Sequence, residues 1–239
     1  MMKNTKQNLV VGSGFVAKNF KKVLKKKTFK DLVIYASGIS NSRIKDRFLL
    51  KKEIHKIKSF LKHNKKMIIY ISTYSVLDPS RNKSLYCKNK IKIENFIKKN
   101  AKNYQIIRFP ELVGKSKNPN TLTNYFYKKL KNKKKFILFK NAIRNFLDVD
   151  HAIKLSLIFI QDIKYKNKII NLINPKNETA KKVVFNLEKI IKKKARYVIN
   201  KKNFKYRKIL SSVKKKDLKK IKIKFDNNYL LKILKKYYN

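Results

Sequence analysis

Apolar residues follow two alternating patterns along the first half of the chain. Short, continuous apolar runs predict buried strands at Asn8–Val11, Leu32–Ala36, Met67–Ile71 and Tyr104–Phe109. Between these runs, apolar residues recur at helical spacing in three segments, Phe15–Lys26, Phe48–His63 and Tyr86–Lys99. Strands that alternate with helices and have no polar face are typical of a parallel sheet covered by helices on both faces. The first half therefore predicts an α/β fold.

The second half of the chain is less regular. The spacing of apolar residues predicts helices at Leu122–Leu130, Asp150–Ile160 and Thr179–Lys193. Thr179 and an acidic residue are suitable N-caps for the last two. Strands are expected at Phe136–Phe139, Asn145–Val149 and Ile169–Ile173, and basic helices mixed with a short strand from Asn203 onward. No internal repeat and no linker rich in Gly, Ser or Pro divides the chain.

Length and composition exclude several classes of protein. With 239 residues, 43% of them hydrophobic, the chain can bury a sizeable core, so it is not a wholly disordered basic protein. The longest apolar candidate, Leu155–Ile160, is far shorter than the ~20 residues of a membrane-spanning helix. The N-terminus lacks a signal-peptide core, so we expect a cytoplasmic protein. Three scattered histidines and one cysteine offer no metal site or intrachain disulfide, and Cys87 and His151 are expected to be packing or surface residues.

The formal net charge of +52 has two interpretations. A charge of this size is typical of proteins that bind nucleic acid or an anionic membrane surface. It also fits codon bias, because only seven of the 65 basic residues are arginine, while Asn, Ile, Phe and Tyr are abundant and Gly, Pro, Ala and Trp are scarce. The lysines are spread along the whole chain, which favours bias over one binding segment. In either case a basic surface speeds the encounter with anionic substrates.

Two of the four glycines lie in the motif Gly12-x-Gly14-x-x-Ala17, between the first predicted strand and the first predicted helix. Gly12 suits a tight turn, Gly14 lets the backbone approach a pyrophosphate, and Ala17 allows the helix to pack on the strand. The helix N-terminus attracts phosphate groups. The motif therefore predicts a nucleotide-cofactor site, and the alternative is a tight turn without a ligand. The acidic residue that usually holds the cofactor ribose has no counterpart, since Asp31 precedes its strand.

Tyr86 and Lys90 are four residues apart and so share one face of a predicted helix. An ammonium near a phenol lowers the pKa of the phenol, and such a tyrosine can serve as acid or base in hydride-transfer chemistry. A hydroxyl from Thr73 or Ser72, at the end of the preceding strand, could hold a substrate oxygen. The spacing alone is a weak signal, because it recurs at Tyr125, Tyr127 and Tyr197. Tyr86 differs from these three because only it follows a buried strand that ends in Ser-Thr. The alternative interpretation of the Tyr86–Lys90 pair is a surface tyrosine beside a solvated lysine.

Taken in order, these motifs resemble the extended short-chain dehydrogenase/reductases, the NAD-dependent epimerases and dehydratases of sugar nucleotides. The resemblance spans most of the chain and rests on Val11–Ala17, Asp31–Gly38, Ile71–Val76, Tyr86–Lys90 with Glu94, Ile107–Pro110 with Gly114, Arg144–Asp150 and Ile170–Asn174. It implies a Rossmann-like parallel sheet with helices on both faces, without the family's usual second and third strands, and a small C-terminal substrate subdomain. Residues 1–162 would form the NAD(P)-binding core, with 115–147 partly in the substrate region, and residues 163–239 the subdomain.

The resemblance also implies roles for individual residues. Tyr86 would be the acid/base, Lys90 its pKa-lowering partner and a ribose contact, and Thr73 the hydroxyl that orients the substrate. Arg144 would hold the diphosphate of a nucleotide-sugar substrate, with Ser75 also in contact. NAD or NADP would lie against Gly12, Gly14, Phe15, Val16, Ala36, Ser37, Lys90 and Pro110. Epimerase, dehydratase and reductase activity all fit this set, and a homodimer would use a helix pair that includes Tyr86–Lys99.

Two other functions stay open at this point. Between Gly14 and Asp31 the chain is too short for the family's second and third strands, which carry the adenosine contacts. A non-catalytic binding or regulatory module that keeps the fold is therefore one alternative. A nucleic-acid binder driven by charge is the other, although no aromatic and basic motif of a known nucleic-acid fold supports it.

Overall fold

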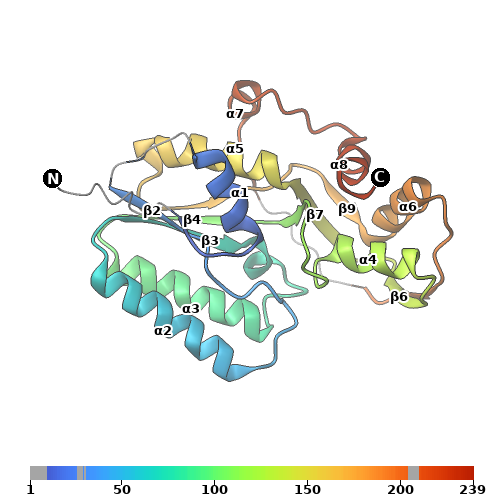
Figure 1. The fold of residues 1–239 in the computed structure, drawn as a ribbon, viewed down its shortest axis with the longest axis horizontal. Coiled ribbons are helices and arrows are strands. Elements are labelled where there is room, and N and C mark those ends of the chain that lie inside the picture. Colours follow the sequence, from blue (N-terminus) through green and yellow to red (C-terminus); the bar gives the residue numbers. More distant parts are fainter. Residues whose placement is uncertain (1–9, 26–28, 30, 204–209) are drawn as a thin grey trace.

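A five-stranded parallel sheet forms the centre of the fold (Figure 1). The computed structural model describes residues 10–25, 29, 31–203 and 210–239. The strands lie in the order β1-β2-β3-β4-β8, and all their pairings are parallel. Their bounds are Val10–Val11, Leu32–Tyr35, Met67–Thr73, Tyr104–Phe109 and Lys168–Asn171. The predicted α/β fold is therefore confirmed, while Asn8 and Leu9 of the first expected strand lie outside the described residues.

Helices cover both faces of this sheet (Figure 1). α1 and α5 lie on one face, and α2 and α3 lie on the other; their bounds are Phe15–Leu24, Val149–Gln161, Arg47–His63 and Leu85–Asn100. Successive side chains of a strand point to opposite faces. Ile34 and Ile69 accordingly join the core beneath α1 and α5, whereas Tyr35 and Tyr70 join the core beneath α2 and α3. The continuous apolar runs of the sequence thus supply two cores at once.

Strand β1 lies at the edge of the sheet. It pairs directly with β2, with Val10 opposite Ile34 and Val11 opposite Tyr35. Among the described residues no strand lies beyond β1, which agrees with the expected lack of two strands at this side. Asp31 lies at the amino end of β2, where its carbonyl accepts a hydrogen bond from the Met67 amide. That end is opposite to the Gly12 turn, so Asp31 is not placed to hold a cofactor ribose.

A smaller lobe adjoins the carboxyl ends of the strands (Figure 1). It contains a three-stranded sheet, a parallel pair of strands and helices packed on them. The bounds are β5 Glu111–Val113, β7 Ile143–Asp148, β9 Asn177–Thr179, β6 Phe136–Phe139, β10 Tyr197–Asn200, α4 Leu122–Lys131, α6 Ala180–Ile191 and α8 Tyr229–Tyr238. Helix α7, Lys215–Lys220, lies beside α5 of the main sheet instead (Figure 1). Two single-turn 3-10 helices, η1 and η2, span Tyr74–Leu77 and Ile163–Tyr165.

Two expectations for the C-terminal part need correction. The division at residue 162 does not separate two sheets, because β8 lies after it and is hydrogen bonded to β4 of the main sheet. The sequence also predicts a short strand after Asn203, but the described residues 210–239 contain helices α7 and α8 and no strand, and residues 204–209 lie outside the described residues. Strand β10 ends before this point, at Asn200, and pairs with β6. Local patterning did not reveal either partner, since each pairing joins segments far apart in the chain. Within the described part of the chain, no helix combines the length and the apolar character that a membrane span needs.

The predicted helix caps are present. Asp148 caps α5 by accepting hydrogen bonds from the backbone amides of Asp150 and His151. Thr179 caps α6 by accepting from the amide of Lys182. Helix α8 then reinforces the first cap, because the ammonium of Lys236 lies 2.9 Å from Asp148 Oδ2. The C-terminus is thereby tied to the start of α5.

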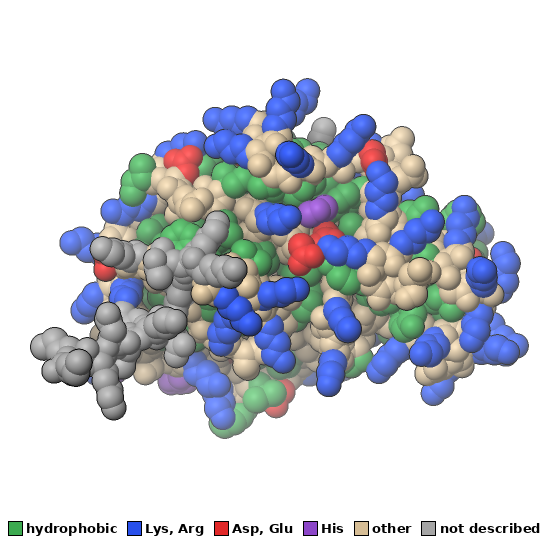
Figure 2. Space-filling model, turned by 45° about the horizontal axis from the view of Figure 1, so that its top comes forward, with side chains coloured by type: hydrophobic (Ala, Val, Ile, Leu, Met, Phe, Trp, Pro, Cys, Tyr) green, Lys and Arg blue, Asp and Glu red, His purple; other side chains and the backbone are tan. Residues whose placement is uncertain are grey.

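Basic side chains are distributed over the surface in the same way as along the sequence. Figure 2 shows lysine and arginine side chains across most of the visible face, with a few acidic groups between them. They do not form a single stripe on this face. This distribution does not single out one element as a binding surface for a polyanion.

Candidate functional site

The two glycines of the βα turn have different backbone conformations and different surroundings. Gly12 has a φ of 127°, and a Cβ there would lie 2.5 Å from the carbonyl oxygen of Ala36. Only glycine fits this position, because both the backbone angle and the neighbouring strand exclude a side chain. Gly14 has a φ of −74° and is the N-cap of α1, and a Cβ there would meet no atom within 4 Å. Gly14 therefore leaves open space in front of the α1 N-terminus.

That N-terminus is suited to an anion. Gly14 has no side chain with which to cap the first amides of α1, and no acidic residue lies in the first turn. The first turn begins with Phe15 and Val16. Lys21, further along the helix, turns back and donates a hydrogen bond of 2.8 Å to the carbonyl of Gly12. Free amides and a nearby ammonium together favour a phosphate group at this position.

Of the other expected cofactor contacts, Ala36 and Ser37 lie beside the same turn. The backbone amide of Ala36 donates to the carbonyl of Val11, which holds the end of β2 beside the turn, with Ser37 next in the chain. Pro110 links β4 to β5. Gly114 follows β5, and a Cβ there would lie 2.6 Å from both Phe15 and Val149. The loop after β5 therefore passes directly against the starts of α1 and α5.

Tyr86 and Lys90 lie on the buried face of α3, as their spacing predicts. The Nζ atom of Lys90 is 5.6 Å from the centre of the Tyr86 ring. It also lies 3.4 Å from the hydroxyl of Tyr70 on β3. The closest partner of Lys90 is Glu53 on α2, whose Oε1 atom is 2.6 Å away. The lysine is thus held in a buried ion pair that the spacing of Tyr86 and Lys90 alone did not indicate.

The expected effect on the tyrosine is reversed. Burial raises the pKa of Tyr86, Lys90 acts in the opposite direction, and Glu53 raises the pKa again, so that the net change is upward. For Lys90, burial lowers the pKa, but the neighbouring Tyr70, Tyr86 and Glu53 raise it above its ordinary value. The spacing of Tyr86 and Lys90 indicates only the attraction of the ammonium, because the burial of the phenol and the countercharge of Glu53 arise from the folded chain.

Glu53 is a site residue that sequence reasoning missed. Its side chain is only 7% exposed, although α2 is rich in lysine. The position follows Leu50 by three residues and precedes Ile57 by four, and both of these are buried. A carboxylate at this spacing lies on the apolar stripe of the helix. That placement is the signal by which Glu53 could have been found.

The hydroxyl groups at the end of β3 have separate partners. Ser72 donates a hydrogen bond of 2.6 Å to Glu94, which also forms a buried ion pair with Arg108. Ser72 therefore belongs to the packing between α3 and β4. Thr73 is the cap of η1, where its hydroxyl accepts from the amide of the buried Ser75 at 3.2 Å. Of the two hydroxyls, Thr73 is the one without a carboxylate partner in these contacts.

Arg144 lies in a group of alternating charges. Its guanidinium donates to the carbonyl of Ile143 at 2.7 Å and is 3.8 Å from Asp78 at the end of η1. Arg81, in the loop before α3, forms an ion pair of 2.6 Å with Glu111 at the start of β5. Burial and then the charge of Arg81 lower the pKa of Arg144. Arg81 is a second basic residue here that the sequence motifs did not identify.

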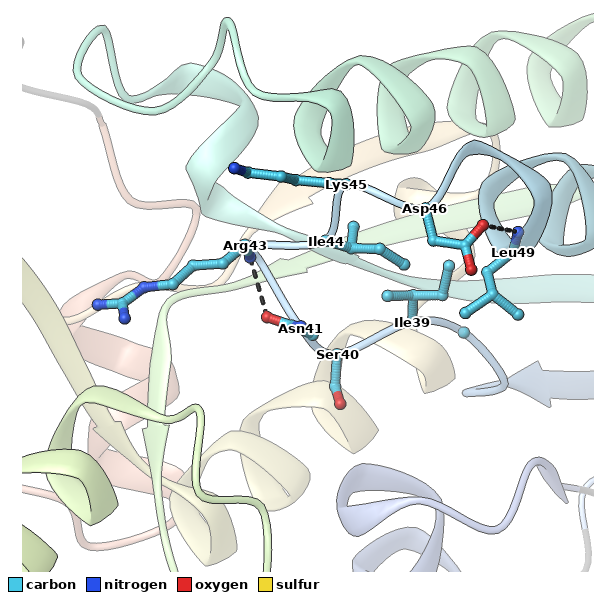
Figure 3. Close-up of a pocket in the computed structure, with 9 residues that line it drawn as sticks. Ile39, Ser40, Asn41, Arg43, Ile44, Lys45, Asp46 and Leu49 are labelled. Atoms are coloured by element: carbon cyan, nitrogen blue, oxygen red, sulfur yellow. Dashed lines mark hydrogen bonds between the residues drawn. The ribbon is translucent and has the colours of Figure 1, made fainter.

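The loop after β2 and the start of α2 line a pocket of about 680 Å³ (Figure 3). Apolar Ile39, Ile44 and Leu49 share its wall with charged residues of the same segment. The loop also reaches the smaller lobe, because Ser40 accepts a hydrogen bond from Asn118 and Arg43 lies over the ring of Tyr125. This segment therefore bridges the main sheet and α4.

Solved structures of nucleotide-sugar enzymes have this architecture. RMD from Pseudomonas aeruginosa, complexed with NADPH, matches with a TM-score of 0.71 and 14% identity over 95% of each chain. UDP-glucuronic acid 4-epimerase from Bacillus cereus, in complex with UDP-glucuronic acid and NAD, matches with a TM-score of 0.69 and 20% identity over 92% of this chain and 76% of the epimerase. UDP-glucose 4-epimerase from Thermus thermophilus, in complex with NAD, gives a TM-score of 0.72 and 10% identity over 94% of this chain and 95% of the epimerase.

The sequence comparisons are negative. No protein-family model matches the sequence, and no curated protein matches it. The likeness is therefore one of structure, at identities that carry the fold alone. The chain has the Rossmann-like α/β fold of these epimerases and of RMD.

Proposed function

We propose that the protein is an NAD(P)-dependent enzyme of nucleotide sugars. The observation that carries this proposal is that the Gly12 turn and Lys90 both lie beside the segment that follows β2, at the carboxyl edge of one parallel sheet, since Gly12 packs on Ala36 and Ser37 and Lys90 packs on Gly38. Ligands of open α/β sheets bind outside this edge. The fold shared with RMD and with the two epimerases, which are complexed with NADPH or NAD, supports the same proposal.

The turn and α1 are suited to the pyrophosphate of a nicotinamide dinucleotide. Gly14 leaves the space a phosphate needs, and the first amides of α1 with Lys21 favour its charge. Phe15, Val16, Ala36, Ser37, Lys90 and Pro110 would complete the contacts. A bound dinucleotide supplies the hydride acceptor or donor for the reaction. Because β1 is the edge strand, the adenosine half would make few contacts with the sheet.

The remaining residues supply acid–base chemistry and substrate binding. The Tyr86 hydroxyl would exchange a proton with the reacting oxygen of the sugar, and Lys90 would fix the position of that phenol. Thr73 would orient the same oxygen by a hydrogen bond, with Ser75 behind it. Arg144 would hold the diphosphate of the nucleotide sugar, which fits its guanidinium geometry.

The proposal is tested by assaying the purified protein with UDP-, GDP- and dTDP-linked sugars and either nicotinamide cofactor. We expect turnover of at least one such substrate, and a loss of kcat of about 10²–10⁴-fold in Tyr86→Phe. Tyr127→Phe is a matched control, because Tyr127 also has a lysine four residues on but lies on α4. Full turnover by Tyr86→Phe would overturn the assignment. A folded protein that binds neither cofactor would favour the non-catalytic module.

A further inference from the structure

Glu53 is a buried carboxylate that the proposed chemistry does not use. Besides the ion pair with Lys90, its second oxygen accepts a hydrogen bond of 2.9 Å from the side chain of Asn89. The backbone amide of Ile39 donates to its first oxygen at 3.3 Å. The partners come from α3 and from the loop after β2, whereas Glu53 belongs to α2. A buried charge with this many partners is held in one orientation.

The backbone is fitted closely around the ion pair. Gly38 follows β2, and a Cβ at this position would lie 2.6 Å from Oε1 of Glu53 and 2.8 Å from Nζ of Lys90. Gly38 therefore gives the two charged groups the space in which they meet. Lys90 and Glu53 have side chains only 5% and 7% exposed, so solvent screens their interaction little.

The countercharge changes what Lys90 does to its neighbour. A lone buried ammonium beside a phenol favours loss of the phenol proton. With a carboxylate 2.6 Å from the ammonium, the pair is neutral as a whole, and its pull on the phenol is weaker. Burial and the charge of Glu53 both raise the pKa of Tyr86, which agrees with this reasoning.

We propose that Glu53 is a positioning residue, which fixes the Lys90 ammonium and cancels its charge so that Tyr86 rests protonated and ready to donate its proton. This inference builds on the proposed function, because it assigns the resting protonation state of the proposed acid/base. A resting proton donor suits the reduction of a keto group in a sugar, in which the substrate oxygen takes up a proton.

Several charged or titratable groups surround Tyr86. Among them, Glu53 is the carboxylate that contacts Lys90, and its negative charge favours the protonated form of Tyr86. Cys87 and Lys90 lie on the same helix, Tyr70 lies on β3, and Arg81 lies in the preceding loop. Arg81 is itself paired with Glu111. The substitution that isolates the effect is therefore Glu53→Gln, which keeps the size and the hydrogen-bonding capacity of the side chain and removes the charge.

The test is an ultraviolet titration of phenolate in the protein without cofactor or substrate. The titration curve of Tyr86 is obtained by subtracting the curve of the Tyr86→Phe variant from that of the protein with Tyr86. This difference is measured once in the wild-type background and once in the Glu53→Gln background. We expect the Tyr86 midpoint to fall by about one pH unit or more in Glu53→Gln. Glu178→Gln, which removes a carboxylate paired with Lys182 in another part of the fold, should leave the midpoint in place.

The variant Glu53→Asp distinguishes an effect of the lost charge from an effect of disturbed folding. It keeps the carboxylate, so the midpoint should move back toward the wild-type value, and circular dichroism reports whether each variant is folded. An unchanged midpoint in folded Glu53→Gln, or a fall of the same size in Glu53→Asp, would overturn the inference. The titration needs neither ligand, so a protein that shows the shift but turns over no nucleotide sugar would refute only the proposed function.

Discussion

The ammonium of Lys90 lies 2.6 Å from the carboxylate of Glu53, with both side chains buried beneath the end of β2. The two residues are on different helices, α3 and α2, so their contact depends on how these helices pack on the sheet. The pair links the helix that carries the proposed catalytic tyrosine to the core of the fold. It is also the contact on which the resting state of the site depends.

Gly38→Ala should disturb this pair directly. The new methyl group would lie within 3 Å of both charged atoms, so the ion pair must separate or the loop after β2 must move. We expect a loss of about 1–3 kcal/mol in the free energy of unfolding, typical of overpacking a buried site. Urea denaturation of the variant and the wild type measures the difference. Equal midpoints and slopes would show that the space around the pair is larger than the structure indicates.

The two glycines of the βα turn should differ sharply in their tolerance of alanine. Gly12→Ala places a Cβ 2.5 Å from the Ala36 carbonyl at a φ of 127°, and we expect it to cost about 1–3 kcal/mol of stability. Gly14→Ala meets no atom within 4 Å and has an ordinary φ, so it should change stability far less. Thermal unfolding of both variants checks this. Similar losses in the two would contradict the assigned geometry of the turn.

Asp148 should be a more important helix cap than Thr179. Besides capping α5, its carboxylate accepts hydrogen bonds from Lys236 and Tyr237 of the C-terminal helix. We expect Asp148→Ala to cost about 2–4 kcal/mol, since it removes a cap and also removes one of the two carboxylates, Asp148 and Asp150, that hold these partners. Thr179→Ala removes only a cap and should cost about 1 kcal/mol. Denaturant unfolding ranks the two, and a smaller loss for Asp148→Ala would show that α8 adds nothing to this cap.

His151 should make stability depend on pH in the weakly acidic range. Burial lowers its pKa, an effect that nearby Asp148 partly opposes, and its Nδ1 atom lies 2.9 Å from the hydroxyl of Tyr229. Because the folded pKa is below the unfolded value of about 6.5, the unfolded chain binds the proton more readily, and stability falls as pH falls through this range. One such group changes the free energy of unfolding by at most ~1.4 kcal/mol per pH unit.

Replacement of His151 by glutamine should therefore flatten this part of the stability profile. Urea unfolding at several pH values between about 5 and 8 gives the slopes. His55, which is exposed on α2, provides the control, because its replacement leaves the half-buried His151 in place. Equal slopes in His151→Gln and in the wild type would show that another group governs the acid response.

Local pattern was enough to predict the strands and helices of the main sheet and the turn between β1 and α1, but not the short strands β5, β9 and β10. The strand Met67–Thr73 and the helix Leu85–Asn100 lie within two residues of their expected bounds, because continuous and helical apolar spacing differ clearly there. Gly12 and Gly14 were identified for the same reason, since a strand and a helix bracket them. The lack of two strands before Asp31 also followed directly from the short segment between Gly14 and Asp31.

What the sequence did not reveal depends on packing between distant segments. Glu53 meets Lys90 across 37 positions, and nothing in either helix alone pairs them. Arg81 joins the charges around Arg144 through Asp78 at the end of η1 and Glu111 at the start of β5, which are far apart in the chain. The raised pKa of Tyr86 arises from the same cause, because burial is a property of the assembled fold.

The most direct test of the proposed function is the binding of a reduced nicotinamide dinucleotide to the Gly12–Gly14 turn. The protein contains no tryptophan, so the fluorescence of the nicotinamide itself is a clear signal. Because a net charge of +52 attracts any polyanion, the titration is done at raised salt and repeated with inorganic pyrophosphate as competitor.

Gly14→Val is the decisive variant, because a Cβ at this position meets no protein atom within 4 Å and the added methyl groups would occupy space before α1. We predict saturable, one-to-one binding of NADH or NADPH to the wild type, and at least tenfold weaker binding to a folded Gly14→Val. Binding that is unchanged in this variant, or no saturable binding of either cofactor to the wild type, would contradict the proposed cofactor site.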